Sequence, residues 1–116
     1  MAKATKKKTE ESDEPSASSG VPPRLKARYE QEILPALRAF APEFLIISAG
    51  FDAHHLDPLA ALELQDSDFS WITEQLMAIA DECCGGRIVS VLEGGYSMQG
   101  LASGTAAHVV ALMRAG

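Results

Sequence analysis

Two short apolar segments constrain the fold of this chain more than any other feature. The first, Phe44–Ala49, is an apolar run without polar alternation, and a second expected strand covers Arg87–Leu92. Such runs are typical of parallel strands that are covered on both faces. Between them, apolar side chains recur at steps of three and four residues from Phe69 to Cys83, as on one face of a helix. The order strand, helix, strand predicts a right-handed βαβ unit.

Helices are expected on either side of this unit. Pro35 lacks an amide donor, so the first helix either kinks there or a fresh helical segment starts at Ile33 or Leu34. Residues 41–42 (Ala-Pro) close it, and a last helix runs from about 98 to 114. The buried face of the first helix is marked by apolar residues three and four positions apart: Leu25, Tyr29, Ile33, Leu37 and Phe40.

The middle helix has recognisable ends. Ser67 is its expected N-cap, and Gly85-Gly86 stops it, because glycine readily adopts the conformation that ends helices. The predicted element order is α-β-α-β-α, in the α/β class. Two parallel strands leave unpaired backbone on both outer edges, and a two-stranded sheet rarely stands alone. The apolar strands therefore predict more sheet beside them.

The first 22 residues differ in composition from the rest. Residues 1–20 are rich in Lys, Glu, Ser and Asp and have no apolar residue larger than alanine after the initiator Met. Such a segment cannot bury enough surface to offset its chain entropy, which predicts a disordered tail over 1–22 and a folded domain over 23–116. The four Lys and four acidic residues of the tail cancel, so the formal net charge of −6 belongs to the domain and argues against a general nucleic-acid binder.

The sequence shows no membrane or disulfide signal. No apolar segment approaches the roughly 18 to 20 residues that span a bilayer, and the N-terminus lacks the apolar region of a signal peptide. A cytoplasmic location is expected, with the nucleus as the alternative in a eukaryote. Cys83 and Cys84 are adjacent, a poor arrangement for a disulfide and too few donors for a metal site. They are expected to be small residues at a helix end.

Polar motifs follow both expected strands. The segment 48–59 (SAGFDAHHLDPL) follows the first strand, and Glu93-Gly94-Gly95-Tyr96 follows the second. A buried strand that ends in Gly and then Asp delivers a carboxylate at the carboxyl edge of a parallel sheet, where open α/β folds build their sites. Because neighbouring parallel strands lie roughly 4.8 Å apart, the two strand ends can converge on one site.

Together, the two motifs resemble the zinc-dependent histone deacetylase and acetylpolyamine amidohydrolase family, over roughly residues 29–113. The resemblance implies the carboxyl-terminal part of the arginase/deacetylase three-layer parallel sheet, so that residues 23–116 form a partial histone deacetylase-like domain. It also implies Zn²⁺ as cofactor and an acetylated lysine or polyamine as substrate. By lineage, the reaction is zinc-dependent hydrolysis of the acetyl amide.

The resemblance assigns roles to the motif residues. Asp52 matches a zinc ligand, and zinc hydrolysis needs such carboxylate or imidazole ligands with one open position. Tyr96 matches the catalytic tyrosine, whose hydroxyl donates to the substrate carbonyl and then to the oxyanion. Leu59 matches a position lining the substrate channel, and Gly94 and Gly95 make room there for the chain reversal. For Asp52 and Tyr96, the alternative is a role in the turns alone.

The histidines of the first motif have a plainer interpretation. His54 lies two residues beyond Asp52 and could imitate a D-x-H metal pair, but in the family this position is not a ligand. A hydrogen-bonding role is therefore expected for His54, and exposure for His55. Asp57-Pro58 is expected to fix the loop, because proline restricts both its own backbone and that of its predecessor.

The family's catalytic set is incomplete in this sequence. The tandem His-His general base and the upstream D-x-H that supplies two further zinc ligands have no counterpart ahead of Asp52. We therefore expect the chain to be inactive alone, as a truncated or split product. Two alternatives remain: a non-enzymatic interaction module, complementing another chain's sheet or self-associating through open edges, or a metal site built from Asp52, His54 and His55 alone.

Overall fold

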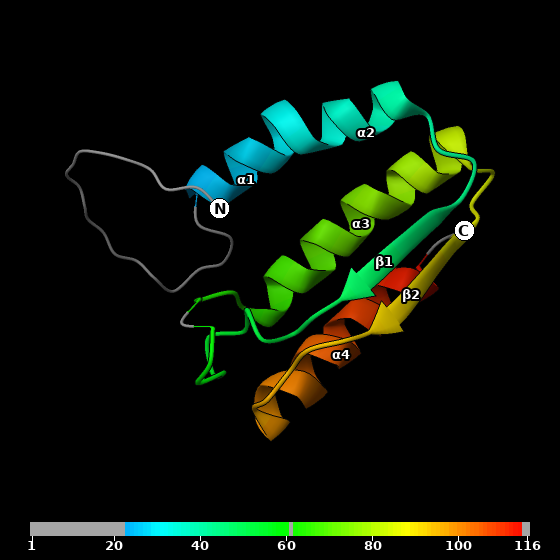
Figure 1. Cartoon of the computed structure of the whole chain (residues 1–116). Helices are drawn as coiled ribbons and strands as arrows, with labels where there is room; N and C mark the ends of the chain where they lie inside the picture. Colours follow the sequence, from blue (N-terminus) through cyan, green and yellow to red (C-terminus); the bar gives the residue numbers. More distant parts are fainter. Residues whose placement is uncertain (1–22, 61, 115–116) are drawn as a thin grey trace.

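The computed structural model describes residues 23–60 and 62–114 (Figure 1). The expected tail over 1–22 lies outside the described residues. The chain forms four α-helices, one π-helical turn and two strands within the described ranges, in the predicted order with the first helix divided into three pieces. These elements are α1 (Pro23–Arg28), η1 (Tyr29–Ile33), α2 (Leu34–Phe40), β1 (Leu45–Ala49), α3 (Asp66–Cys83), β2 (Ile88–Leu92) and α4 (Met98–Met113).

The two strands form the predicted parallel pair. Leu45 lies opposite Ile88 and Ala49 lies opposite Leu92, so the strands are in register over their whole length and end together. α3 connects them, which confirms the strand-helix-strand unit, and both strands begin one residue later than expected. Because the strands are parallel and end together, their carboxyl ends bring the two polar motifs to one edge of the sheet.

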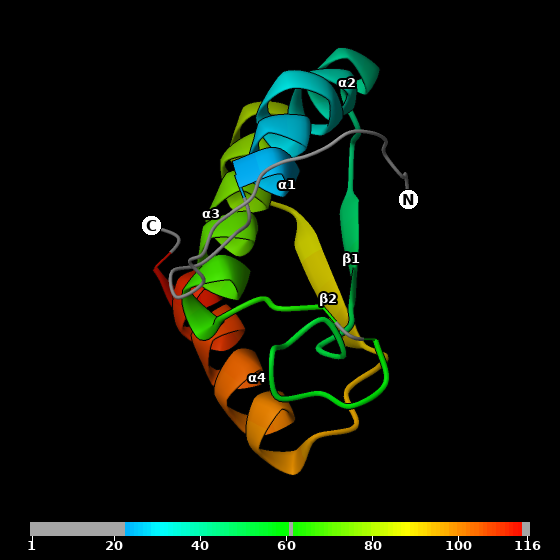
Figure 2. The same ribbon diagram turned by 90° about the vertical axis from the view of Figure 1, so that its left-hand side faces the viewer.

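Only one face of the sheet is covered by the described helices. Leu45 and Ala49 of β1 are buried beneath α3 and α4, whereas Ile46, Val89 and Val91 on the opposite face are 65%, 45% and 51% exposed. Figure 2 shows α3 and α4 on the same side of the two strands, with α1 and α2 lying along α3. The expectation that both faces are covered is therefore wrong for the described chain. Its apolar pattern suits a fully enclosed strand, but no described element covers the second face.

The first helix changes its hydrogen-bonding pattern just before Pro35. The amide of Leu34 donates to the carbonyl of Tyr29, five residues back, which is the π-helical pattern. Pro35 then stands in the first turn of α2, where it has no N–H to donate to the preceding helical turn. The prediction of a fresh segment at Leu34 is confirmed. Ala41 ends α2 in the left-handed conformation, with φ of 52°.

The start of α3 differs from the prediction. Its N-cap is Gln65, not Ser67: the Gln65 side chain accepts from the Asp68 amide, and Asp68 Oδ2 accepts from the Gln65 amide at 2.7 Å. This reciprocal pair is a capping box, and it leaves Ser67 exposed in the first turn. The predicted stop is confirmed, because Gly85 and Gly86 both have positive φ, 61° and 80°.

The core consists of two clusters beneath the sheet. One joins Leu45 to Ala80 and Cys84 at the start of the strands. Cys84 is fully buried, and both cysteines are free, as expected for small residues at a helix end. The second cluster lies near the strand ends and contains Ala49, Phe51, Leu64 and Phe69.

Within residues 23–60 and 62–114, no helix is long and apolar enough to cross a membrane.

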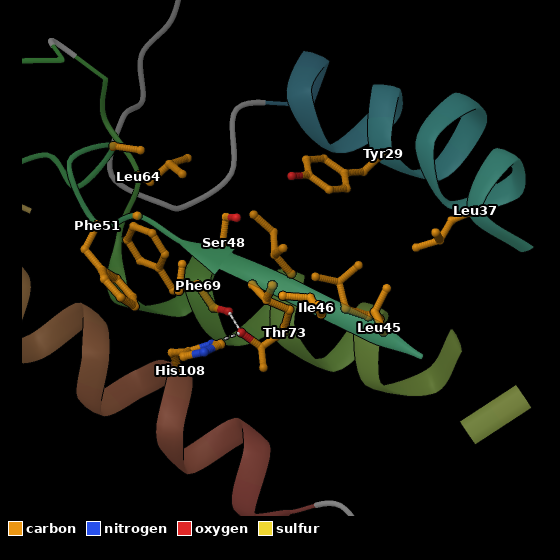
Figure 3. A pocket seen from close by; sticks show the side chains of 16 residues that line it. Tyr29, Leu37, Leu45, Ile46, Ser48, Phe51, Leu64, Phe69, Thr73 and His108 are labelled. Carbon is orange, nitrogen blue, oxygen red and sulfur yellow. Dashed lines mark hydrogen bonds between the residues drawn. The ribbon is translucent and has the colours of Figure 1, made fainter. Parts of the chain in front are cut away.

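A buried histidine crosses the space between α3, β2 and α4. His108 is 6% exposed, and its Nδ1 lies 2.7 Å from the hydroxyl of Thr73 (Figure 3). Its Nε2 lies 2.8 Å from the hydroxyl of Ser90. The Thr73 hydroxyl donates to the Phe69 carbonyl, so it accepts from Nδ1–H of His108. Nδ1 therefore carries a proton. Burial lowers the pKa of His108 from its ordinary value of 6.5, which favours the neutral ring.

Candidate active site

The loop after β1 and the turn after β2 continue side by side beyond the strands. The amide of Glu93 donates to the carbonyl of Ala49 at 2.9 Å, and the amide of Phe51 donates to the carbonyl of Gly94 at 2.7 Å. These two hydrogen bonds continue the parallel pairing of β1 and β2 beyond the end of each strand. As a result, Asp52 lies directly beside the Gly94-Gly95 turn.

The Asp52 carboxylate occupies space that two glycines leave open. A Cβ atom at Gly50 or at Gly94 would lie 3.0 Å from Asp52 Oδ1, closer than such atoms normally approach. The side chain is half-buried, yet its oxygens accept no hydrogen bond from the described residues. Within the described part of the chain, Asp52 is thus a carboxylate that lies beside two glycines and accepts no hydrogen bond.

Gly95 has a different reason to be glycine. Its φ is 148°, which side chains rarely adopt, and a Cβ there would lie 2.8 Å from Leu101 Cδ1 of α4. This turn delivers Tyr96, which is 61% exposed and whose hydroxyl has no hydrogen-bond partner among the described residues. Leu59, the other predicted channel residue, is 66% exposed on the neighbouring loop. The structure thus places all five predicted site residues at the carboxyl edge of the sheet, while their functional roles stay predictions.

His54 is fully engaged and cannot serve as a free metal ligand. Its Nδ1 accepts from the Leu56 amide at 3.1 Å, and its Nε2 lies 2.9 Å from Asp66 Oδ1. The ring is 1% exposed and packs on Gly100 of α4, where a Cβ would lie 2.9 Å from Nδ1. The expected hydrogen-bonding role is confirmed, and His54 fastens the loop to α3 and α4.

The remaining candidate for a local metal site also fails on geometry. His55 is exposed, as predicted, and stacks on His54 with 4.6 Å between ring centroids. Among the described residues, no three His, Cys, Asp or Glu side chains gather so that they could hold a metal ion. Catalytic zinc sites use three protein ligands, so Asp52 with its described neighbours does not fit a complete zinc site.

Asp57 has a larger role in this edge than the sequence indicated. Its carboxylate is 6% exposed, and its Oδ2 accepts from the amides of Tyr96 at 2.7 Å and Ser97 at 3.2 Å. Its Oδ1 accepts from the Leu59 amide at 2.9 Å. Burial acts to raise the pKa of Asp57, but these donors outweigh it and hold the pKa below the ordinary 3.8. The sequence suggested only that Asp57-Pro58 fixes its own loop.

Comparison with known proteins gives a consistent family. Residues 18–112 match the histone deacetylase domain. The chain is 40% identical over 82 residues to "Histone deacetylase 10, chloroplastic" of Oryza sativa subsp. japonica, covering 71% of this chain and 18% of that protein. It is 38% identical over 84 residues to a "Probable deacetylase" of Archaeoglobus fulgidus, covering 72% of this chain and 23% of that protein.

A solved structure agrees with these relatives. The crystal structure of the HDA15 HD domain superimposes with a TM-score of 0.66 at 37% identity, over 74% of this chain and 24% of that one. The chain therefore spans 18% to 24% of the length of these three proteins. The match to the family over residues 18–112 includes both polar motifs and the strands that carry them.

Proposed function

Because the chain belongs to the histone deacetylase family, with a fold that is part of the arginase/deacetylase sheet, we propose that it supplies one part of a zinc-dependent deacetylase site. The substrate class is an acetylated lysine or polyamine, and the reaction is hydrolysis of the acetyl amide. The observation that carries this proposal is the position of Asp52 and Tyr96 at one sheet edge, where the carboxylate and the phenol hydroxyl have no hydrogen-bond partner among the described residues. Structural carboxylates in turns normally accept backbone amides, whereas Asp52 accepts none from the described residues.

In this proposal each site residue has a distinct task. Asp52 contributes one zinc ligand, and the Tyr96 hydroxyl donates a hydrogen bond to the substrate carbonyl oxygen as negative charge develops there. Leu59 lines the approach to the site. Gly94 leaves room for the Asp52 carboxylate, and Gly95 allows the turn that presents Tyr96.

The same residues explain why the chain alone is proposed to be inactive. One carboxylate binds zinc weakly, and the sequence has no counterpart of the family's tandem His-His general base ahead of Asp52. Zinc ligands, a general base and an oxyanion donor accelerate hydrolysis only when all are positioned around the same substrate amide. The missing donors must come from further polypeptide.

Zinc titration of the purified chain tests the proposal that this chain supplies only one zinc ligand. We expect calorimetry to show no zinc binding tighter than that of an Asp52→Ala variant, since a single carboxylate does not make a site. Asp81→Ala, which removes an exposed carboxylate at the far end of α3, is the matched control. Micromolar or tighter binding that is lost in Asp52→Ala alone would show a complete local site and contradict the proposal.

A second candidate function is docking of the remaining deacetylase polypeptide along β1. The strand pairs with β2 on one side only within the described chain, and its other edge lines an apolar groove of about 440 Å³. Figure 3 shows Tyr29 and Leu37 facing this edge from the first helices, with Phe69 and Thr73 approaching from α3. An unpaired parallel edge with apolar walls favours a further strand.

The proposed occupant is a strand from the part of a deacetylase domain that this chain lacks. The chain matches 24% of the HDA15 HD domain, so most of such a domain lies outside the match and could supply this strand. The bare apolar sheet face, with Ile46, Val89 and Val91 exposed, continues from the same edge. Patches of this kind on a small domain mark interaction surfaces.

Co-expression tests the docking proposal. The chain is expected to co-purify with the unmatched part of the HDA15 HD domain, and an Ile46→Lys variant should lose it, because the charge falls on the docking face at a position 65% exposed. Met113→Lys, at a position 77% exposed on α4, is the matched control and should retain it. Equal recovery with both variants, or a self-dimer in place of the complex, would contradict the assignment.

A further inference from the structure

We propose that Asp57 is the positioning residue of this edge: its carboxylate fixes the backbone of Tyr96 relative to the loop that carries Asp52. The catalytic meaning of this role rests on the function proposed for Tyr96. The structural role stands on the hydrogen bonds alone.

The carboxylate joins two segments that are far apart in the sequence. Oδ1 accepts from the Leu59 amide, two residues on, as in an ordinary aspartate turn. Oδ2 accepts instead from the amides of Tyr96 and Ser97, 39 and 40 residues on. A loop-fixing aspartate needs only the first of these bonds, so the other two are contacts between the loop and the turn.

The bonds to Oδ2 are placed where they have most effect. The carboxylate is 6% exposed, so water competes little for its lone pairs. Hydrogen bonds from amides to an ionised acceptor are stronger than those between neutral groups. Ser97 is also the N-cap of α4, and a negative charge is favourable beside the amides that begin a helix.

Tyr96 has few other restraints on its backbone. Two glycines precede it, one of them with φ of 148°, and its own side chain is mostly exposed. Its amide donates to Asp57 at 2.7 Å, the shortest bond that the carboxylate makes. Without that acceptor the turn could adopt several conformations, and the position of the Tyr96 hydroxyl would vary with them.

The loop is itself held, so Asp57 can act as a fixed reference. His54 anchors it to α3 through Asp66 and rests on Gly100 of α4. The carboxylate of Asp52 and the backbone of Tyr96 are therefore both placed relative to the same rigid loop. Precise placement of such groups matters, because small displacements of a catalytic group lower the rate strongly.

Amide hydrogen exchange on the unmodified chain is the first test. The amides of Tyr96 and Ser97 are expected to exchange at least about tenfold more slowly than those of Met98 and Gln99, which stand in the first turn of α4 without an intrahelical acceptor. Exchange of all four at the same rate would show that the carboxylate does not hold the turn, and would overturn the proposal without the need for any variant.

Fluorine NMR supplies a signature that a merely structural residue would not move selectively. The chain has two tyrosines, Tyr29 and Tyr96, so 3-fluorotyrosine labelling gives one resonance for the site and one internal reference in η1. We expect Asp57→Asn to shift or broaden the Tyr96 resonance and to leave that of Tyr29 in place. Asp81→Asn, the same change at an exposed position, should alter neither.

The outcomes are separable. An unchanged Tyr96 resonance in folded Asp57→Asn overturns the proposal, whereas partial return of the native resonance in Asp57→Glu supports it. If Asp57→Asn loses both native resonances, the exchange rates of the unmodified chain decide. None of these readouts requires zinc or turnover, so a failure of the proposed deacetylase function leaves them unaffected, and their failure leaves that function standing.

Discussion

Replacing His108 with alanine is expected to destabilise the chain by roughly 2 to 4 kcal/mol, the range for emptying a buried site of this size. The imidazole fills the space between α3, β2 and α4, and it satisfies the hydroxyls of Thr73 and Ser90. Alanine removes the packing and leaves those hydroxyls without this partner. Because small domains have only about 5 to 15 kcal/mol of stability, urea denaturation should show a much lower midpoint.

His55→Ala is the matched control for this change. His55 is exposed, so the same substitution there should alter the free energy of unfolding by no more than about 0.5 kcal/mol. Equal effects of the two substitutions would contradict the bridging role of His108.

The same histidine gives the stability a pH dependence of defined sign. Burial lowers the pKa of His108 in the folded chain, whereas the unfolded chain has the ordinary value of 6.5. Below pH 6.5 the unfolded state binds more protons, so stability falls as the pH falls. We expect a lower urea midpoint at pH 5.5 than at pH 7.5, and a smaller difference in His108→Ala. The stabilisation from Asp57 is lost only below its ordinary 3.8, outside this window.

The largest effect on chemistry is expected from Tyr96→Phe in the assembly with complementing deacetylase polypeptide. Loss of one preorganised donor to an oxyanion typically lowers kcat by roughly 10² to 10³. KM should change little, because the hydroxyl acts mainly on the developing charge. Steady-state kinetics on an acetyl-lysine peptide measure both quantities.

Tyr29→Phe provides the comparison. Tyr29 belongs to η1 and lines the groove of the docking proposal, so removal of its hydroxyl should leave kcat within about twofold when the complementing polypeptide is present at saturation. A Tyr96→Phe assembly that retained full kcat would remove the tyrosine from the proposed mechanism.

Local pattern predicted the elements well because they depend on local chemistry. Gly85-Gly86 ends α3, since glycine permits positive φ, and Pro35, which lacks an amide donor, follows the change from π-helical to α-helical hydrogen bonding. The Ser67 cap was wrong because Gln65 and Asp68 cap the helix reciprocally, a pairing that single-residue preferences underrate. The prediction that both sheet faces are covered was wrong. Apolar runs indicate that strands are suited to burial on both faces, but no described element covers the second face.

The candidate site was predictable only in part, for a similar reason. Asp52 and Tyr96 could be singled out because each stands in a distinctive motif at a strand end. The link from Asp57 to Tyr96 could not, because its donors are backbone amides 39 and 40 residues away, and any residue except proline carries an amide. His108 gave no signal either, since Thr73 and Ser90 meet it only in the folded chain.

The most direct test of the central claim is a deacetylation assay on an acetyl-lysine peptide with the purified chain alone and added zinc. The chain is proposed to hold one zinc ligand and one oxyanion donor without the rest of the site, which predicts no turnover above that of a Tyr96→Phe control. Circular dichroism on the same sample should show its helices folded. Turnover by the chain alone that Tyr96→Phe abolishes would contradict the account.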